Sequence, residues 1–181
     1  PILNIAVQAA RAAGRVTLRY LDRLDTLSVT SKGRNDFVSE VDRLAEQAII
    51  DVVHKAYPGH SILAEESGAT TGDDHEWIID PLDGTTNYLH GFPQYAVSIG
   101  MRHKGRLEQA VVYDPLKEEM FTASRGQGAQ LNDRRIRVGR CISLETALLG
   151  SGFPFRTMDE LEMYMATFKA LVPVTAGIRR A

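Results

Sequence analysis

Apolar and small side chains recur at steps of three and four in two stretches near the start of the chain, residues 2–24 and 39–56. This spacing places them on one face of a helix, so the pattern predicts two amphipathic helices. The polar stretch 25–38 between them predicts a loop. Ser39 or Asp36 is expected to cap the second helix, because either side chain can accept a hydrogen bond from the free amides of a first helical turn.

The period of the pattern changes after residue 60. Short apolar runs between turn residues predict strands, and from residue 94 these runs alternate with turns such as Asp114-Pro115, as in an antiparallel meander. Two helices followed by successive strands indicate an α+β fold rather than repeated βαβ units. The predicted strands are 61–64, 77–79, 95–101, 107–113, 120–123, 130–131 and 135–138.

After Cys141 the pattern predicts a strand over 146–150, a helix over 158–171 and a strand over 172–178. We therefore expect an α+β domain over 1–141 and the start of a second, α/β domain over 142–181. Since the sequence stops without a turn, a cap or a polar tail, we expect this second domain to be incomplete.

Composition excludes several classes of protein. A net charge of −2 over 181 residues gives no electrostatic footprint for nucleic acid or an anionic membrane, although a local patch for RNA remains open. The single cysteine rules out a disulfide within the chain, and no Cys/His zinc spacing occurs. No apolar run reaches the length of a membrane span, and the first residues lack the pattern of a signal peptide, so we expect a cytoplasmic protein.

The most informative stretch is Trp77-Ile-Ile-Asp-Pro-Leu-Asp-Gly-Thr-Thr-Asn87. An apolar strand is expected to deliver Asp80 at its end, because Pro81 has no N–H with which to continue a ladder. Asp83 follows after a turn, and Gly84 permits a sharp bend or a close approach to a ligand. The residues Asp-Pro-Leu-Asp-Gly are also typical of an ordinary turn with no bound metal. A buried strand aimed at paired carboxylates nevertheless favours a cation site, because close like charges repel unless a cation lies between them.

Such a loop suits magnesium, which prefers oxygen ligands. Asp80 is placed to bridge two ions, Glu65 at the end of an earlier strand is a further carboxylate, and the Leu82 carbonyl is an extra oxygen. Two ions about 3.5–4 Å apart can hold the attacking and leaving oxygens of a phosphoryl transfer. Backbone amides of Gly84 and Thr85, at the start of a short helix, are candidates for holding the phosphate.

Asp42 lies near the start of the second predicted helix. On spacing alone it is most simply a solvated acid favoured by the helix dipole. Alternatively, Asp42 has a catalytic role, in which it pairs with Thr85 and the two together deprotonate a water. His90 and Cys141 have no partner of the kind that catalysis needs nearby in the sequence, and we interpret both as structural.

Three motifs in this order resemble the inositol-monophosphatase family. They are Asp36-Phe-Val-Ser-Glu-Val-Asp42, Glu65-Glu66-Ser67 and the Trp77–Asn87 stretch. The similarity runs through essentially the whole chain, and Arg125-Gly-Gln-Gly-Ala-Gln-Leu-Asn132 resembles the bacterial SuhB branch of the family in particular. The family continues past the end of this sequence, where a later Trp-Asp motif supplies another carboxylate to the second metal.

The resemblance implies a layered helix/sheet sandwich and a lithium-sensitive, often dimeric phosphatase acting on myo-inositol 1-phosphate and similar phosphate monoesters. It implies Mg²⁺ ligands at Glu65, Asp80, Leu82 and Asp83, with Asp42 and Thr85 activating the water. It implies substrate and phosphate contacts at Asp83, Gly84, Thr85 and Thr86.

The same resemblance leaves a second function open. Proteins of the SuhB branch are partners of the transcription machinery, in antitermination complexes on ribosomal RNA operons with NusA and RNA polymerase. On that interpretation the phosphatase core is a regulatory scaffold and its catalysis is dispensable. Nothing in the composition points to this role, and both functions can hold for one protein.

Overall fold

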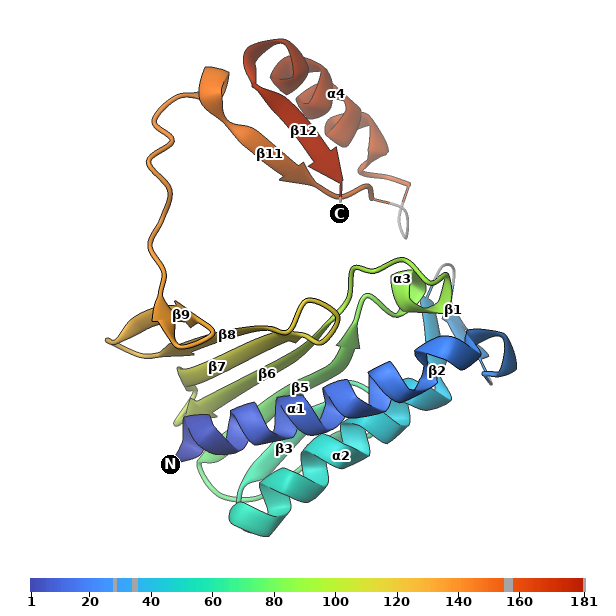
Figure 1. Cartoon of the computed structure of the whole chain (residues 1–181), viewed down its shortest axis with the longest axis vertical. Coiled ribbons are helices and arrows are strands. Elements are labelled where there is room, and N and C mark those ends of the chain that lie inside the picture. Colours follow the sequence, from blue (N-terminus) through green and yellow to red (C-terminus); the bar gives the residue numbers. More distant parts are fainter. Residues whose placement is uncertain (28, 34–35, 155–157, 181) are drawn as a thin grey trace. The chain divides into compact units, whose positions relative to one another are not determined.

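The computed structural model describes residues 1–27, 29–33, 36–154 and 158–180 (Figure 1). Contacts divide the chain into two compact units, Pro1–Lys32 with Phe37–Ile136 and Gly33–Asp36 with Arg137–Ala181. The expected domain boundary after residue 141 stays a prediction. Within the described residues, no helix is both long enough and apolar enough to cross a membrane.

In the first unit, α1 (Ile2–Tyr20) and α2 (Glu40–Ala56) lie against one another and against one sheet. Alanines form much of the buried stripe of α1, and their small size allows the helices to approach closely. Helix α1 ends before the predicted residue 24, because Leu21–Thr26 forms a 3₁₀ helix, η1. A Cβ on Gly14 would lie 2.6 Å from the Cε1 atom of Tyr113, so a glycine is needed where α1 meets the sheet.

Within the described residues, eight strands form one sheet in the order β10-β9-β8-β7-β6-β5-β3-β4. Strands β3 and β5 are parallel, and the other neighbours are antiparallel. The predicted α+β fold is therefore confirmed, with a mixed sheet. The strands are β3 (Ser61–Ala64), β4 (Gly68–Thr70), β5 (His75–Asp83), β6 (Ala96–His103), β7 (Arg106–Asp114), β8 (Glu119–Ser124), β9 (Gly128–Leu131) and β10 (Arg134–Arg135).

Two predictions for this unit are wrong in part. The expected loop over 25–38 contains β1 (Val29–Gly33) and β2 (Asp36–Ser39), which pair with each other. Both carry β-branched or aromatic residues, which favour strands. The strand expected over 135–138 stops at Arg135, and Val138, in the part predicted as strand, is 95% exposed.

A small apolar cluster lies apart from the main core and supports the loop after β5. It consists of Val41 of α2, Leu82, Tyr95 and Tyr88 of α3 (Thr85–Leu89). The hydroxyl of Tyr88 donates a 2.7 Å hydrogen bond to the backbone carbonyl of Thr17 in α1. Helices α1 and α2 are thus both in contact with this loop.

The second unit contains η2 (Leu144–Thr146), β11 (Leu148–Ser151), α4 (Leu161–Leu171), η3 (Val172–Val174) and β12 (Gly177–Arg180). β11 and β12 pair in parallel, which is an α/β arrangement. The strand predicted over 172–178 is wrong at its start. Pro173 lies inside η3 and has no N–H for a ladder.

Candidate metal centre

Strand β5 carries Asp80 to the edge of the apolar cluster. The strand buries Trp77 and Ile79, and it pairs with β6 up to Asp80 opposite Ser98. The register then shifts before Asp83 pairs opposite Ala96. Pro81 therefore interrupts the ladder as predicted but does not end the strand, because the chain bulges there and returns.

The structure brings together the carboxyl groups of Glu65, Asp80 and Asp83. The amide of Glu65 donates to the carbonyl of Ile79 at 3.1 Å and so extends the parallel pairing of β3 with β5. Burial raises the pKa of Asp80 to about 7, together with the charge of Glu65, a hydrogen bond to its side chain and the charge of Asp83. The amide of Leu82, which donates to Asp80 Oδ1 at 3.1 Å, acts in the opposite direction. This loop therefore concentrates negative charge that a cation would neutralise.

A second Asp-Pro-Leu turn in the same chain provides an internal comparison. At Asp114-Pro-Leu-Lys117 the amide of Leu116 donates to Asp114 Oδ1 at 3.0 Å, as Leu82 does to Asp80. There the fourth residue is a lysine, whose Nζ lies 2.6 Å from Asp114 Oδ2 and supplies a positive charge. At Asp80-Pro-Leu-Asp83 the fourth residue is another acid. The two turns share their backbone bond and differ in charge, so turn chemistry alone does not account for Asp83.

The donor atoms of this loop fit a magnesium ion. They are carboxylate oxygens of Glu65, Asp80 and Asp83 and the backbone carbonyl of Leu82, all oxygens of the kind that Mg²⁺ prefers. Asp83 and Glu65 are exposed, whereas Asp80 is half-buried, so the group is accessible from solvent.

Asp42 is a buried partner of Thr85 rather than a solvated acid. Its side chain is 2% exposed, and its Oδ1 lies 2.9 Å from the hydroxyl oxygen of Thr85, 43 positions along the chain. Asp42 Oδ2 accepts hydrogen bonds from the amide and the hydroxyl of Ser39, the residue that caps α2. Of the two caps left open by the sequence, the structure shows Ser39. These bonds fix the carboxylate while its other oxygen faces Thr85.

Gly84 joins β5 to α3 in a conformation that other residues avoid. Its φ is +97°, in the left-handed region, and an added Cβ would lie 3.0 Å from the carbonyl oxygen of Gln94. Thr85 and Thr86 are the first two residues of α3. The carbonyl of Thr86 lies 2.7 Å from Nδ1 of His90, which is consistent with a structural role for that histidine.

Sequence analysis did not single out Glu46, although it lies one helical turn after Asp42 on the buried face of α2. Its carboxylate is 3% exposed and accepts the amide hydrogens of Glu66 and Ser67, at 2.8 and 2.9 Å. The only hint in the sequence is that Glu46 lies four residues, about one helical turn, after Asp42 and so on the same face of the predicted helix.

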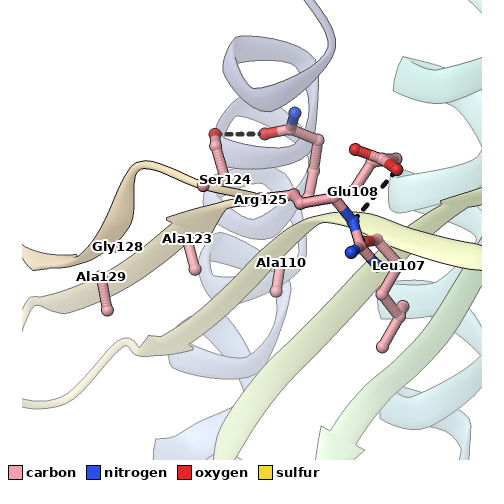
Figure 2. A pocket seen from close by; sticks show the side chains of 10 residues that line it. Leu107, Glu108, Ala110, Ala123, Ser124, Arg125, Gly128 and Ala129 are labelled. Carbon is pink, nitrogen blue, oxygen red and sulfur yellow. Dashed lines mark hydrogen bonds and ion pairs between the residues drawn. The ribbon is translucent and has the colours of Figure 1, made fainter.

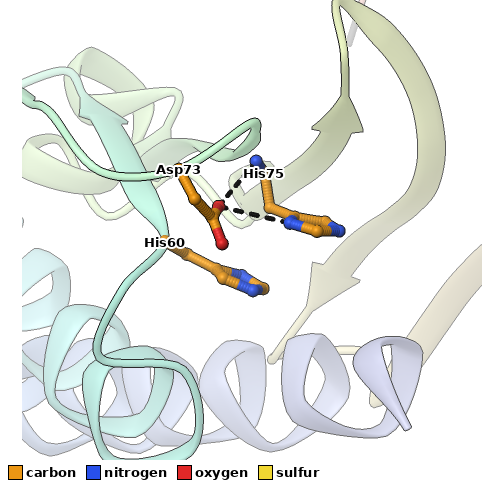
Figure 3. Close-up of side chains that lie close together, drawn as sticks. All are labelled: His60, Asp73 and His75. Carbon is orange, nitrogen blue, oxygen red and sulfur yellow. Dashed lines mark hydrogen bonds and ion pairs between the residues drawn. The ribbon is translucent and has the colours of Figure 1, made fainter.

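His60, Asp73 and His75 form another group whose possible ligand atoms all lie within 4.8 Å of one another (Figure 3). The two imidazole rings are nearly parallel, with an interplanar angle of 11° and centroids 4.5 Å apart, and His75 stacks in turn on His103. Imidazole lone pairs lie in the ring plane, so stacked rings do not point at one ion. His60 Nδ1 also accepts the indole N–H of Trp77 at 3.0 Å. We interpret the group as an aromatic stack.

A shallow hollow lies over β7, β8 and β9 (Figure 2). Ala110, Ala123 and Ala129 are neighbours across these strands and line it, and Glu108 pairs with Arg125 beside it at 3.2 Å. Its walls are mainly small and apolar, so it offers packing surface rather than acid–base or ligand chemistry.

The whole chain, residues 1–181, matches the inositol monophosphatase family. It is 56% identical to the Nus factor SuhB of Pseudomonas aeruginosa, over 100% of this chain and 69% of that protein. It is 48% identical to the Nus factor SuhB of Escherichia coli, over 99% of this chain and 68% of that protein.

Two solved structures show the same architecture. The extragenic suppressor protein SuhB from Bartonella henselae matches at 41% identity with a TM-score of 0.95, over 99% of this chain and 69% of that one. The inositol monophosphatase of Thermotoga maritima matches at 32% identity with a TM-score of 0.85, over 98% of this chain and 67% of that one. The chain therefore belongs to the inositol monophosphatase family and has the fold of its phosphatases.

Proposed function

We propose that this chain carries the metal centre of a Mg²⁺-dependent phosphatase that hydrolyses small phosphate monoesters, with myo-inositol 1-phosphate as the preferred candidate substrate. The observation that carries the proposal is the clustering of Asp80 with Glu65 and Asp83, at a turn whose counterpart holds a lysine. Membership of a family that includes inositol monophosphatases supports the reaction class.

In this proposal Glu65, Asp80, Asp83 and the carbonyl of Leu82 hold Mg²⁺. A cation bound by these residues would supply Lewis acidity toward the attacking water, the phosphoryl oxygens and the departing alkoxide. Burial, the charge and hydrogen bond of Glu65 and the charge of Asp83 raise the pKa of Asp80, and a cation held there would favour its ionised form.

Thr85 and Asp42 handle the proton of the attacking water. The hydroxyl of Thr85 has one hydrogen and two acceptors in reach, Asp42 Oδ1 at 2.9 Å and the Leu82 carbonyl at 3.0 Å. A carboxylate is the stronger acceptor. Donation to Asp42 leaves the lone pairs of the hydroxyl to accept from a water, and leaves the carbonyl of Leu82 available to the cation.

Phosphate and substrate contacts are assigned to the start of α3. The backbone amides of Gly84 and Thr85 are the donors, with Thr86 beside them and Asp83 for a substrate hydroxyl. The left-handed Gly84 allows the chain to turn sharply at this point.

The experiment is phosphate release from myo-inositol 1-phosphate with Mg²⁺ or with EDTA. The wild type, Asp83→Asn and the exposed control Asp25→Asn are compared. We expect release that needs Mg²⁺, is lost in Asp83→Asn and is kept in Asp25→Asn. A folded chain that binds the metal but releases no phosphate would contradict the proposed activity.

The finer properties implied by the family resemblance are part of the same proposal. They are inhibition by lithium, a homodimer and a cytoplasmic location. Each is open to direct measurement, by inhibition, by sedimentation and by fractionation.

A second candidate function rests on the names of the relatives, which are Nus factors. We propose that the chain also serves transcription antitermination on ribosomal RNA operons, with NusA and RNA polymerase as partners. The test is read-through of a ribosomal RNA leader with Asp83→Asn protein. Read-through that survives the loss of hydrolysis supports a separate regulatory role, and read-through lost with hydrolysis contradicts it.

A further inference from the structure

We infer that Glu46 is a positioning residue of the metal centre, which sets the place of Glu65 and thereby the affinity for the divalent cation. This inference rests on the proposed metal function of Glu65 and Asp80. Glu46 itself touches neither the proposed ion nor the substrate.

The contacts of Glu46 define what it holds. Glu65, Glu66 and Ser67 form the turn between β3 and β4, where Ala64 pairs with Gly68. The two Glu46 carboxylate oxygens each accept one amide of this turn, Oε2 from Glu66 at 2.8 Å and Oε1 from Ser67 at 2.9 Å. Two charge-assisted bonds from one planar group fix both the position and the orientation of the peptide.

Glu65 is therefore held from both sides. Its own amide donates to the carbonyl of Ile79 on β5, and the next two amides along the chain donate to Glu46 on α2. With the backbone fixed in this way, the side chain of Glu65 stays within hydrogen-bonding reach of Asp80. A metal ligand on a turn needs this kind of support, because loss of outer contacts lowers metal affinity.

One face of α2 thus organises both halves of the site. Asp42 holds Thr85, and Glu46, one turn further on, holds the Glu65 turn. Both side chains are almost wholly buried. Burying a carboxylate costs free energy unless it accepts hydrogen bonds, so two buried acids on a helix that packs against a sheet point to a specific role for each.

The experiment measures Mn²⁺ binding from the decrease of the free-ion electron paramagnetic resonance signal, in the whole 181-residue chain without substrate. The variants are Glu46→Gln, which replaces one acceptor oxygen by a donor, and Glu46→Asp, which keeps the charge but shortens the side chain. Val53→Ala is the matched control, because Val53 is buried in the same helix and belongs to the main core rather than to the site. Asp80→Asn removes a proposed ligand and so tests whether the measured Mn²⁺ binds at this centre.

We expect wild-type binding that Asp80→Asn abolishes and that Val53→Ala leaves within twofold. Both Glu46 variants should weaken it by about 10- to 100-fold. If circular dichroism shows that one of the two Glu46 variants is unfolded, the comparison is made with the other Glu46 variant. Equal binding in the Glu46 variants and in Val53→Ala overturns this inference while the proposed function stands. Wild-type binding that is absent, or that survives in Asp80→Asn, overturns the metal centre and this inference together.

Discussion

Replacing Asp83 by lysine converts the Asp80–Asp83 turn into a copy of the Asp114–Lys117 turn. In the latter, the lysine Nζ lies 2.6 Å from the carboxylate of Asp114. We expect the lysine introduced in Asp83→Lys to pair with Asp80 in the same way. The variant should then be more stable than the wild type without metal, and it should no longer gain stability from Mg²⁺.

The magnitude follows from Asp80. Burial first, then Glu65 and least of all Asp83 raise its pKa to about 7 from an ordinary value of 3.8, so the whole shift is an upper bound for what replacing Asp83 can recover. At about 1.4 kcal/mol per pKa unit, ionising Asp80 in the folded chain costs at most about 4 kcal/mol. Asp80 is half-buried, so solvent screening lowers this to about 1–2 kcal/mol. The folded carboxyl keeps a proton that the unfolded chain releases, so wild-type stability falls as pH rises from about 4 to about 7 and stays low above.

The assay is thermal unfolding followed by the fluorescence of Trp77, the single tryptophan of the chain and a buried residue of β5. In EDTA at pH 8 we expect Asp83→Lys to melt about 3–6 °C above the wild type, and this gap to shrink toward pH 4. Asp25→Lys controls for net charge. A variant that melts at the wild-type temperature at pH 8, or that gains as much from Mg²⁺ as the wild type, would refute the charge argument.

Three further substitutions test other parts of the structure. Thr85→Val keeps the shape of the side chain but removes the hydroxyl, so phosphate release should fall by about 10²- to 10⁴-fold with an unchanged circular dichroism spectrum; a smaller loss would remove Thr85 from the proton path. Gly84→Ala should lower the free energy of unfolding by about 1–2 kcal/mol in denaturant titration, since its φ is +97° and its Cβ would crowd the Gln94 carbonyl; an unchanged midpoint would show that the loop relaxes. Gly14→Ala should destabilise by about 1–3 kcal/mol despite the higher helix propensity of alanine, because its Cβ meets Tyr113; a rise in stability would contradict the close contact.

The helices and most strands could be predicted because their apolar spacing reflects which face each element buries. Less predictable features depend on partners far along the chain. The bulge at Pro81 is set by the pairing of β5 with β6 on both sides of it. Local alternation also predicted strand as far as Val138, whereas β10 ends at Arg135 and Val138 is exposed.

In the candidate site, too, residues with a local motif were predictable and residues with distant partners were not. The ordered acidic motifs predicted Glu65, Asp80 and Asp83 as neighbours, and the structure places them together. Spacing alone favoured a solvated Asp42, because its partner Thr85 is 43 positions away and only the packing of α2 on the sheet brings them to 2.9 Å. Glu46 had no motif to mark it, since its partners are backbone amides, which any sequence supplies.

The proposed metal centre can be tested directly by the anomalous scattering of a crystal grown with Mn²⁺ in place of Mg²⁺. We expect a peak about 2.1 Å from carboxylate oxygens of Glu65 and Asp80 and from the carbonyl of Leu82. A well-ordered crystal with saturating Mn²⁺ whose only peak lies at His60, Asp73 and His75, or which shows no peak, would contradict it.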